Sequence, residues 1–139
     1  MSGALTILAY VSIFAAFLWV PYILGAFFTR GFGILGYPVD LKPLPAWAKR
    51  AERAHLNLLE NLPPFAALVI VAEFAKADAA ATAMWASVFL VARLIHWLVF
   101  VLKIPVLRTL AFVAGFVAQL MIFLQIMSAT DFALPVLPF

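Results

Sequence analysis

The chain has 139 residues, of which 68% are apolar and 11% are charged, with a formal charge of +3. Soluble domains carry about 25% charged residues, so this composition excludes a water-soluble fold. It predicts one all-α integral membrane domain over residues 1–139. The absence of cysteine excludes disulfides and thiolate metal sites, and two histidines without a carboxylate cluster favour no metal. Cations that flank apolar spans argue against nucleic acid as a partner.

The first apolar stretch predicts a transmembrane helix from about Ala4 to Phe28, which Pro21 is expected to kink locally. Residues 1–29 carry no charge, unlike the basic start of a signal peptide, so we expect this helix to be retained. A connector rich in Gly and Pro follows, roughly from Arg30 to Pro45.

Three further helices complete a predicted four-helix bundle, and they run from about Trp47 to Lys76, Ala80 to Leu102 and Val106 to Met127. Pro63 and Pro64 should bend the second helix in mid-membrane. The very short turn between the third and fourth helices makes these two antiparallel neighbours. The tail from Ala129 to Phe139 is expected to lie along the membrane surface.

Four spans place both termini on one side of the membrane. The connector and the turn after Leu102 then share the other side, which holds most of the Lys and Arg residues: Arg30, Lys42, Lys49, Arg50, Arg53, Lys103 and Arg108. The positive-inside rule predicts that this side is cytoplasmic. Short loops favour a bacterial inner-membrane protein.

The polar run Arg53–Asn61 interrupts the second helix. Its Arg53, Asn57 and Glu60 fall on one helical face, because positions i, i+4 and i+7 nearly eclipse. Charges that face lipid cost at least about 2.5 kcal/mol each. This face should therefore border protein or a watery cavity, and it predicts a binding site.

The third and fourth helices bring more polar groups to the same half of the membrane, namely Arg93, His96, Arg108 and Thr109. Guanidinium groups bind carboxylates bidentately, so the surplus of arginine suits an anionic ligand. Glu60 would suit a ligand that also carries an ammonium. A zwitterionic peptide with two carboxylates and one amine fits this set.

Structural roles are open alternatives for the charged residues. Glu60 could pair with Arg53 or with Arg93 and hold the bundle together, and Arg93 could combine such a pair with a ligand contact. Arg108 could instead reach lipid phosphates, as Lys103 is expected to do.

The two histidines also have structural alternatives. His55 lies off the predicted face and is interpreted as a helix-packing or interfacial residue, whereas His96 is either a ligand contact or a hydrogen-bonded core residue. Gln119 and Gln125 are interpreted as interhelical hydrogen-bonding residues. The scattered Phe and Trp residues are interpreted as lipid-facing surface.

The segment Glu52–Asn61, followed by a proline and Phe65, resembles the signature of the MAPEG family (membrane-associated proteins in eicosanoid and glutathione metabolism). Arg93–His96 and Arg108–Thr109 are similar to its second block. Within that family the chain looks like a bacterial-type relative of microsomal glutathione transferases and prostaglandin E synthases. The resemblance implies a four-helix protomer, a homotrimer, and glutathione bound between protomers in the cytoplasmic half.

By position, the resemblance implies that Arg108 stabilises the glutathione thiolate. It assigns the remaining contacts to Arg53, Asn57, Glu60, Arg93, His96, Thr109 and Arg30. Three positions depart from the family pattern: Leu56 replaces an arginine, and Phe100 and Phe112 replace tyrosines. The lost hydroxyl donors predict a lower affinity for glutathione.

The leading hypothesis is a glutathione-dependent transferase or peroxidase that acts on hydrophobic electrophiles or lipid hydroperoxides within membrane lipid. The alternative is a non-catalytic MAPEG-like protein that binds lipid or a protein partner. A small drug/proton exporter is disfavoured, because such exporters use a carboxylate in helix one and this first helix has none.

Overall fold

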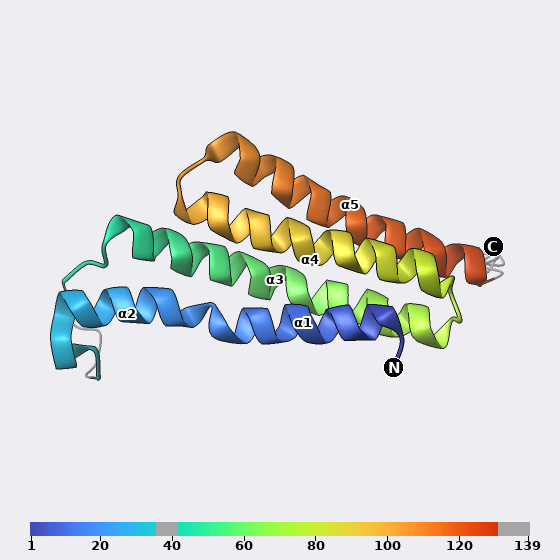
Figure 1. The fold of residues 1–139 in the computed structure, drawn as a ribbon, viewed down its shortest axis with the longest axis horizontal. Helices are drawn as coiled ribbons and strands as arrows, with labels where there is room; N and C mark the ends of the chain where they lie inside the picture. The colour runs from blue at the N-terminus through green and yellow to red at the C-terminus, as the bar shows by residue number, and fades with distance from the viewer. Residues whose placement is uncertain (36–41, 131–139) are drawn as a thin grey trace, which may run out of the picture.

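The structure is a computed structural model that describes residues 1–35 and 42–130. Its helices form an elongated bundle of four spans, and α1 begins at the same end of the bundle as α5 ends (Figure 1). Each span is long and apolar enough to cross a bilayer, with 32, 29, 23 and 25 residues in chain order. The protein is therefore a multi-pass integral membrane protein with a four-helix architecture, as predicted.

The first span consists of two helices rather than one. Helix α1 (Gly3–Phe17) is followed after Leu18 by α2 (Trp19–Arg30), and the 3-10 helix η1 (Gly31–Leu35) comes next. Pro21 lies four residues after Phe17, so it offers no N–H to the Phe17 carbonyl and its ring crowds that group. The predicted local disruption at Pro21 is confirmed.

The other three spans are α3 (Ala46–Phe74), α4 (Ala79–Val101) and α5 (Pro105–Ala129), close to the predicted bounds. Helix α3 runs through Pro63 and Pro64 without a break, and the bend expected at these residues stays a prediction. The surface location predicted for the C-terminal tail falls mostly on residues 131–139, which lie outside the described residues.

Together with α3, helix α4 lies at the centre of the bundle, and it packs against α1, α3 and α5. Its contact with α5 is the most extensive of any pair, which confirms that these helices are neighbours. Phe65 on α3 and Phe89 on α4 are fully buried and stack with ring centroids 3.9 Å apart. The interpretation of the phenylalanines as lipid-facing is wrong for these two.

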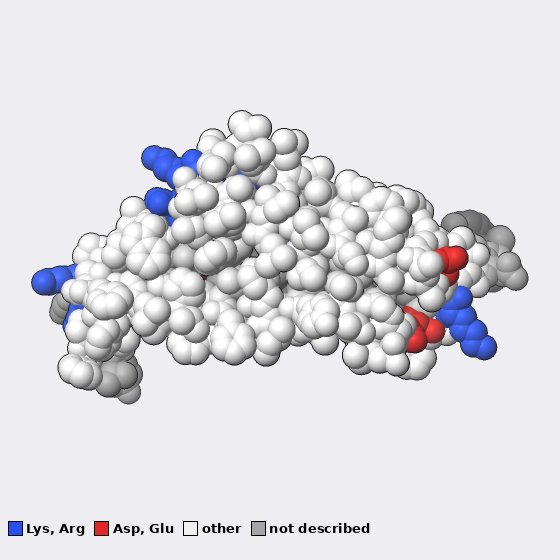
Figure 2. All heavy atoms as spheres, in the orientation of Figure 1, with Lys and Arg blue, Asp and Glu red and all other residues white. Residues whose placement is uncertain are grey.

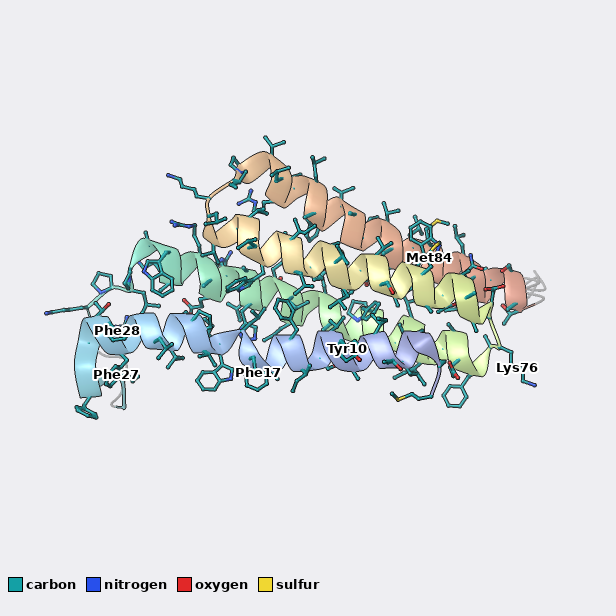
Figure 3. The ribbon with its side chains drawn as sticks, viewed as in Figure 1. Tyr10, Phe17, Phe27, Phe28, Lys76 and Met84 are labelled. Carbon is teal, nitrogen blue, oxygen red and sulfur yellow. The ribbon has the colours of Figure 1, made fainter. Side chains whose placement is uncertain are left out.

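The outer surface of the bundle is largely apolar. Tyr10 and Phe17 on α1 are 56% and 64% exposed (Figure 3). Large apolar side chains are also exposed along α4 and α5, including Val91 and Phe116. Such a continuous apolar exterior is suited to lipid rather than to water.

Candidate functional site

The predicted polar face of α3 opens onto a small cavity. Arg53, Leu56, Asn57 and Glu60 line it together with Phe100 of α4, and its volume is about 100 Å³. Arg53 and Glu60 are exposed on the single chain, and Asn57 is half-buried. The prediction that residues 53, 57 and 60 share one face is confirmed. We refer to this space as the α3 cavity.

Arg93 lies directly behind this cavity and is only 1% exposed. Its Nη1 donates to the Asn57 Oδ1 atom at 3.2 Å, and its Nη2 donates to the Asn61 Oδ1 atom at 3.3 Å. Its Cζ lies 4.9 Å from the ring centroid of Phe89 and 5.3 Å from that of Phe112. Two amide oxygens and two aromatic faces thus stabilise a cation in the bundle interior.

This environment corrects the expected ion pair. Arg93 donates to asparagines rather than to Glu60, and its Nε has no hydrogen-bond partner. Because Arg93 is enclosed, it can act on the α3 cavity only through Asn57 unless the guanidinium is uncovered. Its direct contact with a ligand stays a prediction.

Gly115 on α5 provides the space that the guanidinium fills. A Cβ atom at this position would lie 2.6 Å from the Nη2 atom of Arg93 and 2.9 Å from its Nε. Both distances are shorter than side-chain atoms tolerate, so a larger residue would displace the guanidinium. Helices α3, α4 and α5 therefore each supply a necessary part of the Arg93 site.

Both histidines are core residues in this chain. His96 is 4% exposed, and its ring lies 5.5 Å from that of Phe100 and 6.1 Å from that of Phe112. His55 is also buried, and the Tyr22 hydroxyl lies 3.2 Å from its Nδ1. The packing role predicted for His55 is confirmed. His96 is buried like a core residue, but no hydrogen bond to its ring is found among the described residues, and its contact with a ligand stays a prediction.

Arg108 borders a second cavity, of about 260 Å³, at the turn between α4 and α5. The side chain is half-buried, and its Cζ lies 5.0 Å from the centroid of the Phe100 ring. Phe100 also lines the α3 cavity, so the two cavities share this residue. We refer to the second space as the turn cavity.

Two further predicted site residues lie outside both cavities. Thr109 is exposed, and its hydroxyl donates to the Pro105 carbonyl of its own helix at 3.1 Å. Arg30 donates through Nε to the Lys42 carbonyl at 2.6 Å and so ties the end of α2 to the connector. The chain by itself does not bring these two residues to the α3 cavity.

A family comparison matches residues 6–128 to the MAPEG family. The chain belongs to the MAPEG family. The matched region contains every helix of the bundle apart from its extreme ends, and both cavities. No curated protein matches the chain. MAPEG proteins include glutathione transferases and related proteins, so membership establishes the fold and leaves the activity to be argued from the site.

Basic side chains of this MAPEG chain gather at one end of the bundle. In Figure 2, most of the visible Lys and Arg atoms lie at the end that contains the α4–α5 turn. The visible acidic atoms lie at the opposite end, beside one further basic side chain. Lys76, labelled in Figure 3, is at the acidic end, in the turn after α3. We refer to the end with the α4–α5 turn as the basic end. Both cavities lie in the half of the bundle next to it.

Three contributors to the site were not recognised in the sequence: Asn61, Phe89 and Gly115. Asn61 follows Asn57 by four residues, a spacing that places both amides on one helical face. Its Nδ2 donates to the Asn57 carbonyl at 2.7 Å, which directs its oxygen toward Arg93. That spacing was the available signal, whereas nothing in an apolar run distinguishes Phe89 or Gly115 from ordinary packing residues.

Proposed function

We propose that this MAPEG protein is a membrane-bound glutathione-dependent transferase or peroxidase that acts on hydrophobic electrophiles or lipid hydroperoxides. The observation that carries the proposal is the convergence of Arg53, Asn57 and Glu60 on one cavity. A guanidinium, an amide and a carboxylate on adjacent turns suit a ligand that bears both carboxylates and an ammonium. Glutathione has this combination of groups.

The size of the α3 cavity supports a homo-oligomer. About 100 Å³ is below the ~300–1,000 Å³ of an ordinary ligand pocket, so one chain holds only part of the tripeptide. Arg53 and Glu60 are exposed on the single chain, and lipid is a poor neighbour for either charge. A second protomer would cover both and complete the pocket, in agreement with the homotrimer that the family resemblance implies.

Membrane orientation follows from the charge distribution. The basic end carries the cations of the connector and of the α4–α5 turn, which the positive-inside rule assigns to the cytoplasm. Glutathione would then bind from the cytoplasmic side. We propose a bacterial inner membrane as the location, with the hydrophobic substrate entering from the bilayer.

Arg108 is the proposed catalytic residue. A free thiol has a pKa of about 8.5 and is mostly protonated at neutral pH, and a neighbouring cation lowers that value. With Arg108 beside the sulfur, the thiol proton leaves to water. The thiolate then forms a bond to the electrophilic carbon while the leaving group departs with its electron pair. Asn57, oriented by Arg93, would help to fix the peptide.

The test is conjugation of glutathione to a chlorinated dinitrobenzene by purified protein in detergent. At pH 7, Arg108→Ala should reduce the rate about 10- to 30-fold, the gain in thiolate fraction from lowering a pKa near 8.5 by about two units. At pH 9 the free thiol is largely ionised, so the difference should nearly vanish. Lys49→Ala, which removes an exposed cation from the same end, is the matched control.

Two results would contradict this mechanism. Equal rates for the wild type and Arg108→Ala at pH 7 would remove Arg108 from catalysis. A deficit in Arg108→Ala that is the same at pH 7 and pH 9 would show that the residue does not act through thiol ionisation. No turnover by the wild type would overturn the transferase assignment itself.

A second candidate function is non-catalytic lipid binding. The observation that favours it is a groove of about 700 Å³ between α4 and α5, lined by Met84, Ser87, Val88, Val91, Ala92, Ile95, Leu107, Leu110, Ala111 and Ala114. Nearly all of its lining is apolar. In addition, Phe100 and Phe112 offer no hydroxyl to glutathione. This candidate predicts co-purified lipid and no glutathione-dependent turnover.

A further inference from the structure

The turn cavity at the basic end concentrates positive charge. Its lining residues come from three helices and the turn: Arg50, Val99, Phe100, Lys103, Ile104, Pro105 and Arg108. Three of them are cations, and no carboxylate is among them. Three cationic groups around about 260 Å³ repel one another unless an anion lies between them.

Arg50 is held in place by the end of α4. Its Nε donates to the Val101 carbonyl at 2.8 Å across 51 residues of sequence. The carbonyls of Val99 and Phe100, just before Val101, already accept hydrogen bonds from the backbone amides of Ile104 and Lys103. Arg50 therefore completes the cap of α4, and a guanidinium fixed through Nε retains its Nη donors for a ligand.

The other two cations are positioned by the same turn. Lys103 adopts a φ of +64°, a left-handed conformation that is uncommon outside glycine and that lets the chain reverse within a few residues. The Arg108 guanidinium lies against the ring of Phe100, with Cζ 5.0 Å from its centroid. Two of the three cations are thus restrained before any ligand arrives, which lowers the entropy cost of binding.

The start of α5 adds a further attraction for an anion. Helix α5 begins at Pro105, and its N-cap residue Ile104 has no side chain that bonds to the first-turn amides. Both residues line the turn cavity. Uncapped amides and the positive end of the helix dipole favour phosphate-like groups.

We propose that the turn cavity binds the phosphate of an anionic phospholipid headgroup. The cavity lies at the end of the spans, at the depth where headgroups are found, and its remaining walls are the apolar Val99, Phe100, Ile104 and Pro105. Fixed cations beside apolar walls match a phosphate attached to a glycerol and acyl chain. Without a carboxylate to receive an ammonium, the cavity favours a net negative headgroup over a zwitterionic one. The proposal goes beyond the glutathione reaction and shares only Arg108 with it.

The test is a lipid titration followed by native mass spectrometry of the protein in detergent. Binding of phosphatidylglycerol and of phosphatidylcholine with identical acyl chains is compared for three proteins. These are the wild type, a cavity double variant (Arg50→Gln with Lys103→Gln) and a surface control double variant (Lys42→Gln with Lys49→Gln). The last variant removes the same charge from the same end, at exposed positions that do not line the cavity. The wild type and this control should prefer phosphatidylglycerol, and the cavity variant should lose about tenfold or more in affinity for it, equivalent to about 1.4 kcal/mol.

The single variant Lys103→Gln separates a loss of lipid binding from a loss of folding. The Lys103 side chain is exposed and takes part in no hydrogen bond among the described residues. The variant should retain the wild-type melting temperature and still bind phosphatidylglycerol at least threefold more weakly. Equal losses in the cavity variant and the surface control would overturn the proposal, as would an unchanged lipid preference in both cavity variants.

Inorganic phosphate tests whether the bound anion comes from a lipid or from solution. Millimolar phosphate that displaces phosphatidylglycerol completely would assign the cavity to a soluble anion and overturn the lipid assignment. Conjugation activity, measured on the same preparations, separates this proposal from the catalytic one. Loss of lipid preference in the cavity variants with retained turnover supports the lipid site irrespective of the enzyme. The same loss with no turnover in any preparation, the wild type included, overturns only the transferase.

Discussion

Substitution of Gly115 by alanine tests whether Arg93 organises the bundle. The added Cβ would lie 2.6 Å from the Nη2 atom of Arg93, whereas ordinary contact begins at 3.4 Å, so the guanidinium must move by about 0.8 Å. Its hydrogen bonds to Asn57 and Asn61, at 3.2 and 3.3 Å, are already long. Movement away weakens them further, and movement toward α3 compresses them below the usual range of about 2.7–3.2 Å.

The expected loss of stability follows from three terms. Overpacking costs about 1–3 kcal/mol, and weakening hydrogen bonds from a charged donor costs about 1.5–3 kcal/mol. Alanine returns about 1 kcal/mol through its higher helix propensity. We expect Gly115→Ala to lower the free energy of unfolding by about 2–4 kcal/mol, which corresponds to a melting temperature lower by about 5–15 °C.

The assay is thermal unfolding of the purified protein in one detergent, followed by tryptophan fluorescence. Gly3→Ala is the matched control, because its Cβ would meet only the Cβ of Ala83, at 3.1 Å, and it touches nothing near Arg93. That variant should change stability by less than about 1 kcal/mol, because the gain in helix propensity and the tight contact with Ala83 oppose each other.

A double-mutant cycle with Arg93→Lys isolates the cause. Lysine lacks the branched guanidinium, so Gly115→Ala should be at least 1 kcal/mol less costly in the Arg93→Lys background, within the range of about 0.5–3 kcal/mol for residues in contact. An equal cost of Gly115→Ala in both backgrounds, or a cost no greater than that of Gly3→Ala, would refute the role assigned to Arg93.

Three more substitutions probe neighbouring contacts. Asn61→Leu removes an acceptor of Arg93 and should lower the free energy of unfolding by about 1.5–3 kcal/mol in denaturant titrations, and Asn61→Asp, which keeps the acceptor, should lose less. Tyr22→Phe removes the contact between the hydroxyl and His55 and should cost about 0.5–1.5 kcal/mol; a loss above 3 kcal/mol would point to a different role. Pro21→Ala supplies an N–H for the Phe17 carbonyl, and hydrogen exchange at residues 19–22 should slow; unchanged exchange would show that Pro21 does not cause the break between α1 and α2.

Helix positions were predictable because the spans are long apolar runs bounded by charges, prolines and glycines. The break at Leu18 followed from Pro21, and the contact of α4 with α5 followed from the short turn after Leu102. These features depend on nearby residues alone. Likewise, the shared face of Arg53, Asn57 and Glu60 follows from helical geometry within one element.

The partners of Arg93 could not be predicted in the same way. Helical periodicity fixes which residues of α3 share a face, but not which of them an arginine on α4 will reach. Glu60 offered the stronger Coulomb attraction, and a pair with it was one of the open alternatives for Arg93. In the bundle the guanidinium meets the Asn57 and Asn61 amides instead, because Gly115 opens space at that depth. From the sequence, Phe112 was recognised only as a position where the family has a tyrosine. In the structure its ring covers the guanidinium of Arg93.

The enclosed guanidinium of Arg93 also constrains the biogenesis of the protein. If α4 were inserted alone, Arg93 would enter the bilayer core without hydrogen-bond partners, at a cost of about 2.5–3.5 kcal/mol. The amides that receive this charge are on α3, which is synthesised immediately before α4. The two helices are therefore best inserted as a hairpin, and α5 seals the arginine from lipid when it arrives last.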